Sequence, residues 1–421
     1  MTPEIKQRID KICHGEVPEG YQRTFLGIAP KSWDKSRIDK ICRLSSGSTP
    51  RRDAVENFAG DILWVTSGEL KRRTIEDTRE KISETAVVNS HLEIYDPGTV
   101  VIAIYGLEAA GIRGTVSIIG KQCTISQACM AFTEFKDIDN EFFYYWYLNN
   151  GQVIGLRYAQ GTKQQNLSTD IVGSFPICFP SQGEQQKIAT ILTTQDKVIE
   201  LKEKRLAEKQ RQKKYLVQQL LTGKKRLPRF SGAWKADLLG KLFLERKETN
   251  CEGLQMLAIT GTQGIIPRKE LDLKDNSSED KSKYLRVCVG DIGYNTMRMW
   301  QGVSAYSNYE GIVSPAYTIL KPSSSINAKY FAYLFKTPEI IFLFYRFSQG
   351  LVDDTRNLKY ENFKKIKVFY PPDIEEQTAI AEVLSTADRE IELLQQDIEQ
   401  EKQKKKALMQ LLLTGIVRVE V

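Results

Sequence analysis

The sequence has no long hydrophobic run and no signal-like start. Its longest apolar stretches, TVVIAIYG and EIIFLFYRF, are far shorter than the eighteen or so residues that a membrane-spanning helix needs. The first twenty residues are charged and follow a helical pattern, which is unlike a secretory signal. We therefore expect a cytoplasmic protein without a membrane partner.

Metal-binding and catalytic motifs are also missing. Seven cysteines are scattered without a CxxC pair, and the only two histidines are His14 and His91. Cys123 and Cys129 are expected to be small buried side chains in a strand region. TGKK at position 222 is not a phosphate-binding loop, and FYPPD lacks the amide or carboxylate that amino-methyltransferases place before two prolines. The sequence predicts a non-catalytic chain that binds no metal or cofactor of its own.

A long internal repeat dominates what is present. Residues 180–227 align without a gap to residues 372–419, at an offset of 192 positions, with about 20 identities. Both copies carry a Glu-Gln pair near the start and end in Leu-Leu-Thr-Gly. Such agreement exceeds what helical composition produces by chance, so the chain contains a duplication.

Each copy is predicted to be one long helix. It follows a proline-rich strand end, has glutamate in its first turn and stops at Gly223 or Gly415. About 39 residues at 1.5 Å each correspond to roughly 58 Å of helix. The apolar residues have heptad-like spacing, which requires a partner helix. The seam positions are Ile188, Leu192, Ile199, Leu206, Leu216 and Leu220 in the first copy, and Ile380, Leu384, Ile391, Leu394, Ile398, Leu408 and Leu412 in the second.

Charge favours pairing between the two copies. Residues 184–227 carry twelve Lys or Arg against five Asp or Glu, whereas residues 371–421 carry six against eleven. Opposite net charges favour an antiparallel coiled coil formed by one copy with the other. Polar residues at 195, 202, 209 and 213 weaken the first seam, so two independent solvated helices are the alternative.

The segments before the helices resemble each other only in outline. Each starts with a tryptophan and a short helix-like run, and each ends with an aromatic helix, a glycine and an Asn-Leu step. Between these landmarks the segments diverge and contain strand-like stretches, which predicts α/β heads with many loops. We therefore expect a helical segment at 1–33, a first variable domain at 34–179, a central helix at 180–227, a second variable domain at 228–370 and a final helix at 371–421.

This organisation resembles the specificity subunit of type I restriction-modification systems. The resemblance rests on the duplicated helices, the GTKQQNLS and LLTG motifs, the tryptophan-led starts and the opening RIDKICHGEVPEGYQ. It implies two target recognition domains that each read half of a bipartite site in double-stranded DNA, related by an internal pseudo-twofold repeat. It also implies that the helices act as a spacer and dock two modification subunits. Those subunits would bind S-adenosylmethionine and methylate adenine N6, and restriction subunits, where present, would supply the endonuclease.

Candidate DNA-contacting residues were chosen by chemistry, because the family's base-reading residues vary too much to be carried over. Arg and Lys suit phosphates, and Arg, Asn, Gln and Lys suit base edges in the major groove. In the first domain the candidates are Thr49, Arg51, Arg52, Lys71, Arg72, Arg73, Arg113, Lys163, Gln164 and Gln165. In the second they are Arg268, Lys269, Lys281, Lys283, Asn295, Arg298, Trp300, Gln301 and Arg356.

The stretch YNTMRMWQG is the strongest of these candidates. It places an arginine, two amides and a large aromatic side chain together in an expected loop. Its structural alternative is a packing turn built on Met and Trp, with Arg298 paired to a carboxylate. The Lys and Arg residues of the first helix are open to three readings: contact with phosphates, with the acidic second helix, or with a modification subunit.

Two other functions stay open at this point. The chain could be a coiled-coil scaffold or regulatory module whose heads bind a protein or another ligand without reading DNA sequence. It could also be an enzyme with an unfamiliar site in one head, although no recognisable catalytic motif supports that.

Overall fold

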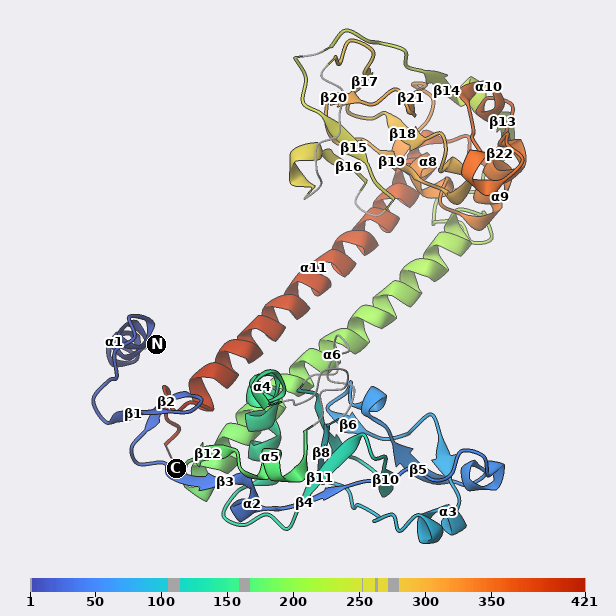
Figure 1. Ribbon diagram of the computed structural model, residues 1–421. Coiled ribbons are helices and arrows are strands. Elements are labelled where there is room, and N and C mark those ends of the chain that lie inside the picture. Colours follow the sequence, from blue (N-terminus) through green and yellow to red (C-terminus); the bar gives the residue numbers. More distant parts are fainter. Residues whose placement is uncertain are drawn as a thin grey trace. The chain divides into compact units, whose positions relative to one another are not determined.

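The protein forms two compact units. The computed structural model describes residues 2–104, 114–158, 167–251, 253–261, 264–271 and 280–420. The first unit contains residues 1–201 and 398–421, and the second contains residues 202–397 (Figure 1). Because the boundaries fall inside the two long helices, each unit contains part of each helix. The five segments expected from the sequence thus group into two units.

The first unit contains the following described elements. Its helices are α1 (Pro3–Cys13), α2 (Ile38–Ile41), α3 (Glu84–Asn89), α4 (Asn140–Tyr158) and α5 (Thr169–Gly173), with the short 3-10 turns η1 (Val55–Phe58) and η2 (Ser67–Glu69). Its strands are β1 (Tyr21–Thr24), β2 (Gly27–Pro30), β3 (Asp34–Arg37), β4 (Arg43–Ser46), β5 (Ile62–Val65), β6 (Thr74–Ile75), β7 (Lys81–Ile82), β8 (Val100–Ala103), β9 (Val116–Ile119), β10 (Cys123–Ile125), β11 (Cys129–Thr133) and β12 (Pro176–Phe179).

Two sheets build the first head. One has the order β4-β11-β8-β9-β6 and the other the order β10-β5-β7. Strands β8, β9 and β11 are buried along almost their whole length, as expected of short, largely apolar runs. Aromatic residues of α4 pack on the five-stranded sheet, and Phe132 and Phe143 meet edge to face with ring centroids 4.9 Å apart. Cys123 and Cys129 are buried in β10 and β11 as expected, and burial raises the pKa of each thiol to about 12.

The N-terminal segment differs from the expectation. Only Pro3–Cys13 is helical, and the chain then forms the antiparallel hairpin β1-β2. Tyr21 of this hairpin donates a hydrogen bond of 2.7 Å to the carbonyl of Gly415. The polar, glycine-containing sequence after residue 14 favours turns rather than a continued helix. The segment starting at Trp33 is likewise a strand, β3, followed by the four-residue helix α2, and not a single helical run.

The second unit has the same arrangement around its long helices as the first, but its head consists of other strands and helices. Its helices are α7 (Leu239–Leu242), α8 (Ala328–Leu334), α9 (Pro338–Phe347) and α10 (Tyr360–Phe363), with the turns η3 (Arg268–Glu270), η4 (Met299–Gln301) and η5 (Asp353–Thr355). Its strands are β13 (Lys235–Leu238), β14 (Phe243–Glu245), β15 (Leu257–Ile259), β16 (Ile265–Pro267), β17 (Leu285–Val287), β18 (Ile292–Asn295), β19 (Ser304–Tyr306), β20 (Gly311–Val313), β21 (Tyr317–Pro322) and β22 (Lys367–Tyr370).

The head of the second unit is built on the sheet β14-β21-β18-β19. Strand β13 pairs antiparallel with β22, as β3 does with β12 in the first unit. In both units the strand after the leading tryptophan therefore pairs with the strand before the long helix. The aromatic core centres on Phe243, Phe331 and Phe363, which are each fully buried.

The long helices are the predicted length. Helix α6 covers Gln182–Leu220 and α11 covers Ile374–Leu412, each with 39 residues. Each chain segment turns at its glycine, where φ is +71° at Gly223 and +67° at Gly415, a backbone conformation that glycine adopts without a steric cost.

Burial along the seam differs from residue to residue, both near the helix ends and in the middle. The residues near the helix ends enter the head cores, so that side chains of both helices complete each core. The buried seam residues are Ile188, Leu192, Ile199, Leu220, Ile380, Leu384, Ile398 and Leu412. The half-buried ones are Leu206, Leu216, Ile391, Leu394 and Leu408.

Polar residues of α6 bond to acids of α11 where the apolar seam is weak. In the first unit the Gln195 side chain donates a 2.6 Å hydrogen bond to Glu401. In the second unit Lys202 contacts Asp397 at 2.8 Å and Lys209 contacts Glu390 at 2.6 Å, while Lys213 bonds to Asp388. These contacts run in antiparallel order, because rising numbers in α6 meet falling numbers in α11 (Figure 1).

Equivalent residues of the repeat make the same closing contact in both units. In the first unit Arg418 binds Glu184 through two hydrogen bonds of 2.7 Å. In the second unit Arg226 binds Glu376 through bonds of 2.5 and 2.6 Å. Both glutamate side chains are only 2% exposed, so each arginine neutralises a buried carboxylate.

The next residue of each copy also has the same role. Gln185 accepts a hydrogen bond from the backbone of Asp139, and Gln377 accepts one from the backbone of Asn327. Each glutamine also donates to the proline carbonyl that precedes its helix. These amides thus fix the start of the head's aromatic helix to the start of the long helix in both units.

No helix in the described ranges is long and apolar enough to cross a membrane. Within the same residues, no group of three or more His, Cys, Asp or Glu side chains is arranged to hold a metal ion.

Candidate nucleic-acid interface

Arg51 and Arg52 lie on the loop after β4, and both are paired. Arg51 is 82% exposed and contacts Asp53 at 2.8 Å. The Arg52 guanidinium stacks over Phe58 at 4.6 Å and bonds to Glu80, with one bond of 3.0 Å. This hydrogen bond raises the pKa of Arg52 and lowers the pKa of Glu80. Arg52 is therefore held against the head, whereas Arg51 extends into solvent.

The three consecutive basic residues at 71–73 have different surroundings. Lys71 and Arg72 are exposed and make no ion pair with any described residue. Arg73 is half-buried, bonds to Glu141 and lies 3.8 Å from Asp196. Burial by itself lowers the pKa of Arg73, but its hydrogen bonds raise the pKa above the ordinary arginine value. Arg73 thus connects the first head to α6, and Lys71 and Arg72 are the residues available to an anionic partner.

Thr49 is half-buried on the same loop as Arg51. The other candidates of the first head, Arg113, Lys163, Gln164 and Gln165, lie outside the described residues.

The stretch YNTMRMWQG begins with the last two residues of β18 and continues as a tight loop. The Asn295 side chain accepts a 2.9 Å hydrogen bond from the backbone of Met297, and η4 follows. Met299 is fully buried and Trp300 is half-buried. Arg298 and Gln301 are exposed, and Arg298 has no carboxylate partner among the described residues. Both sequence readings are thus partly present: a packed Met turn presents an unpaired arginine and an amide.

Arg356 joins this loop through aromatic contacts. Its guanidinium lies 4.0 Å above the Tyr345 ring and 6.0 Å from the Trp300 ring. It also contacts Asp353 at 3.4 Å, and its side chain is only 14% exposed. The loop that carries it is closed by paired backbone hydrogen bonds between Gln349 and Asn357. The Arg356 side chain is therefore held in one position beside the loop.

Sequence reasoning missed the aromatic part of this surface. Tyr345 on α9 is 40% exposed, and its ring centroid lies 6.3 Å from that of Trp300. Met297 is 41% exposed and its carbonyl accepts the Trp300 indole hydrogen bond. The available signal was the spacing of aromatic residues in EIIFLFYRF, which places Phe342 and Tyr345 three residues apart on the exposed side of a helix.

The remaining candidates of the second head lie apart from this cluster. Lys269 and Lys283 are exposed, and Lys281 is half-buried. Arg268 is half-buried in η3 and has partners of its own. Among the described residues, Lys269, Lys281 and Lys283 make no ion pair or hydrogen bond with this cluster.

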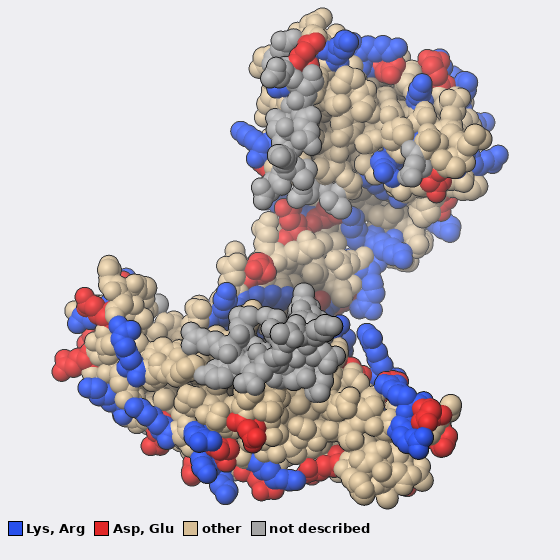
Figure 2. All heavy atoms as spheres, viewed as in Figure 1, with Lys and Arg blue, Asp and Glu red and all other residues tan. Residues whose placement is uncertain are grey.

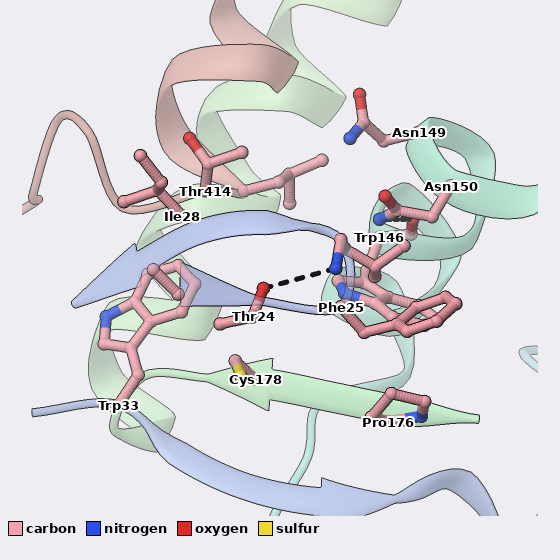
Figure 3. A pocket seen from close by; sticks show the side chains of 13 residues that line it. Thr24, Phe25, Ile28, Trp33, Trp146, Asn149, Asn150, Pro176, Cys178 and Thr414 are labelled. Carbon is pink, nitrogen blue, oxygen red and sulfur yellow. Dashed lines mark hydrogen bonds between the residues drawn. The ribbon is translucent and has the colours of Figure 1, made fainter. Parts of the chain in front are cut away.

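A small cavity in the first unit lies where its two chain segments meet (Figure 3). It has a volume of about 60 Å³ and is lined by the hairpin, α4, β12 and the end of α11, including Trp33, Trp146 and Thr414. This is room for a few water molecules. Cys178 also lines it, and burial raises the pKa of this thiol. The cavity thus belongs to the packing that joins residues 413–414 to the head.

One family model matches most of the chain. Residues 30–211 and 273–403 match the model described as "Type I restriction modification DNA specificity domain". The chain is also similar to two curated proteins. It is 30% identical over 188 residues to the type I restriction enzyme MjaIX specificity subunit of Methanocaldococcus jannaschii, which is 44% of this chain and 42% of that protein. It is 24% identical over 175 residues to the EcoR124I/EcoR124II specificity subunit of Escherichia coli, which is 41% of this chain and 43% of that protein. These matches span less than half the length of either relative.

Solved structures share the fold over nearly the whole chain. The type I restriction-modification S subunit from M. genitalium superimposes with a TM-score of 0.57 at 16% identity, covering 90% of this chain and 96% of that one. A chain from a study of complex assembly and conformational transition of the type I R-M system gives a TM-score of 0.55 at 15% identity, covering 92% and 99%.

Proposed function

Because the chain belongs to the family of type I restriction modification DNA specificity domains, we propose that each of its units reads one half of a bipartite DNA site. One observation supports this most directly. Equivalent residues of the repeat make the same contacts in both units, for example Arg418 with Glu184 and Arg226 with Glu376; we call these shared contacts the frame. The head loops, in contrast, differ between the units. A common frame with two different loop sets suits a target made of two unlike half-sites.

In this proposal the long helices form an antiparallel coiled coil that sets the distance between the half-sites. The alternating contacts of Gln195, Lys202 and Lys209 with acids of α11 support that pairing. The shared helix surfaces dock two modification subunits, which bind S-adenosylmethionine and methylate adenine N6. Restriction subunits, where present, add the endonuclease, and this chain performs no catalysis.

The site residues in the proposal follow from exposure. In the second head Arg298 and Gln301 reach base edges, and Trp300, Tyr345 and Arg356 form the rigid wall beside them. In the first head Lys71 and Arg72 contact DNA. Arg73 holds the head to α6 and does not read DNA, because it is already bonded to Glu141.

The decisive experiment is sequencing of modified bases in genomic DNA. Cells that express the chain with its methyltransferase partner are compared with cells that lack the chain. A split motif that is methylated only when the chain is present is the expected result. A stable complex with the methyltransferase that adds no motif would make the chain a scaffold or regulatory module and would refute sequence reading.

Two variants test separately the proposed roles of the second head and of helix α6. R298A removes a base contact worth about 1 to 3 kcal/mol, so it relaxes one half-site and leaves the other unchanged. Deletion of one heptad from α6 removes about 10 Å of helix and changes the spacer between half-sites by about three base pairs. A spacer that keeps its length would contradict the role of the helices as a ruler.

A further inference from the structure

Some cations of α6 stay unpaired after its contacts with α11 are assigned. Lys202, Lys209 and Lys213 face acids of α11. Five other basic residues between positions 211 and 229, two on α6 and three after its end at Leu220, are exposed and have no ion pair or side-chain hydrogen bond with any described residue. They are Arg211, Lys214, Lys224, Lys225 and Arg229. The acidic helix therefore accounts for only part of the basic charge of the first copy.

These unpaired cations are mostly absent from the second copy of the repeat. The positions equivalent to Arg211, Lys224 and Lys225 carry Gln403, Ile416 and Val417, and Arg229 lies beyond the aligned repeat. Only Lys214 has a basic counterpart, Lys406, which is also exposed. The neighbouring frame residues do not differ, because Arg226 and Arg418 make the same ion pair. The contacts that the two copies share therefore form without these cations.

The five cations lie on the last turns of α6 and in the chain segment that follows it. Arg211 and Lys214 are one turn apart on α6, and the exposed ring of Tyr215, 54% accessible, lies beside them. The chain then turns back on the helix, since the Lys225 backbone donates a 3.1 Å hydrogen bond to the Gln219 carbonyl. Figure 2 shows Lys and Arg side chains gathered over this part of α6. From residue 211 to the end of α6 is about 14 Å of helix, the rise of about four base pairs.

We propose that Arg211, Lys214, Lys224, Lys225 and Arg229 form a phosphate-binding surface that holds the DNA backbone independently of its sequence. This inference rests on the proposed function and names a contact that the heads do not supply. A DNA backbone fits better than an acidic protein, because flexible cations spaced over several phosphates beside one exposed aromatic ring are typical of nucleic-acid surfaces. A partner present in two copies would need the same charges in both copies of the repeat, but Arg211, Lys224 and Lys225 have no basic counterpart in the second copy.

The test measures DNA affinity of the complete complex with its methyltransferase partner as a function of salt. The variant R211Q/K214Q/K224Q/K225Q is compared with wild type on a duplex that contains the methylated motif and on one of equal length without it. Each lost phosphate contact lowers the slope of log K against log salt by roughly one and weakens binding about fivefold at 0.15 M salt. We expect equal losses on both duplexes and an unchanged motif.

The single variants K214Q and K406Q are the matched pair, because these lysines are equivalent in the repeat and both exposed. K214Q should lower the salt slope and K406Q should not. An unchanged slope in the quadruple variant would overturn the phosphate surface, and equal effects of K214Q and K406Q would overturn its restriction to one copy. Unchanged DNA binding with lost recruitment of another subunit would make the surface a protein contact. Failure of the proposed function is seen separately, as the absence of any methylated motif with the wild-type chain.

Discussion

The two units make the same contacts where the repeat is shared and different ones where the heads diverge. Asp196 accepts a 2.7 Å hydrogen bond from Tyr145 in the first unit, and Asp388 accepts one of the same length from Tyr333 in the second. Lys405 and Lys213, themselves equivalent, contact these two aspartates. The heads differ even in their main sheets, which have five and four strands. The frame therefore tolerates different heads because its contacts involve few head residues.

The largest test of this equivalence is removal of the closing arginines. R226A leaves Glu376 buried and unpaired in the second unit, and R418A does the same to Glu184 in the first. Each variant should lose about 3 to 5 kcal/mol, confined to its own unit. Amide hydrogen exchange around residues 380–384 and 188–192 reports the units separately. R226K and R418K, which retain a charge, are the controls, and loss of protection in both units from one variant would break the comparison.

Core truncation at equivalent positions should be nearly as costly. Leu192 and Leu384 are both fully buried, one in each head core. L192A and L384A should each cost about 3 kcal/mol through the lost apolar contacts and the cavity that remains. Denaturant unfolding followed by exchange in each unit measures this. A much smaller loss of stability in one unit would show that its core can rearrange to fill the cavity. The two cores would then differ in packing although their helix contacts are equivalent.

Removal of one tyrosine hydroxyl group should destabilise the two units by different amounts. In the first unit Asp196 keeps Lys405 at 2.6 Å and Arg73 at 3.8 Å when Tyr145 is changed to Phe. In the second unit Asp388 keeps only Lys213 among the described residues. Y333F should therefore cost about 2 kcal/mol and Y145F about 1 kcal/mol. Equal losses measured by thermal unfolding would mean that the bonds of the Tyr145 hydroxyl with Thr193 and Arg73, which Y145F also removes, offset the additional partners of Asp196.

The smallest expected effect is on a solvent-facing pair and depends on pH. The hydrogen bond from Lys209 lowers the pKa of Glu390, so the pair stabilises the folded chain above the ordinary glutamate pKa. This contribution is lost as the pH falls through the lowered pKa. The stability difference between wild type and K209A should therefore shrink in acid, whereas K406Q, which removes an unpaired charge, should show no such trend.

The sequence predicted the frame better than the heads. Identities such as Leu-Leu-Thr-Gly, together with heptad spacing, located two helices of the observed length and the glycines that end them. Opposite net charges offered the acidic second helix as one partner for the basic residues of the first. The individual acid that Gln195, Lys202 or Lys209 would meet could not be assigned, because a seam position is judged by its own polarity and not by the residue opposite. The heads consist of short strands whose pairing partners are far apart in the chain, and local patterns do not encode such pairing.

The candidate site was predicted in part. The loop expected for YNTMRMWQG is present from Thr296 to Gly302, but Tyr294 and Asn295 belong to strand β18, where Tyr294 is fully buried. Arg52 and Arg73 were chosen for their charge, but Glu80 and Glu141 lie beside them in the fold, 28 and 68 residues away in sequence. Neutralisation by distant carboxylates cannot be read from neighbouring residues. Tyr345 was missed because its neighbours in α9 make it resemble a core position.

The discontinuity of the first unit affects the order in which a ribosome can deliver a finished fold. Residues 202–397 leave the ribosome as one uninterrupted stretch and contain the whole second unit. The first unit also needs residues from 398 onward, including Arg418 for Glu184. At about 5 to 20 residues per second, the apolar side of α6 at Ile188 and Leu192 must wait roughly 10 to 40 seconds for its partner segment. The first unit, whose synthesis begins first, is therefore completed last. Its incomplete nascent form is the one that chaperones need to protect.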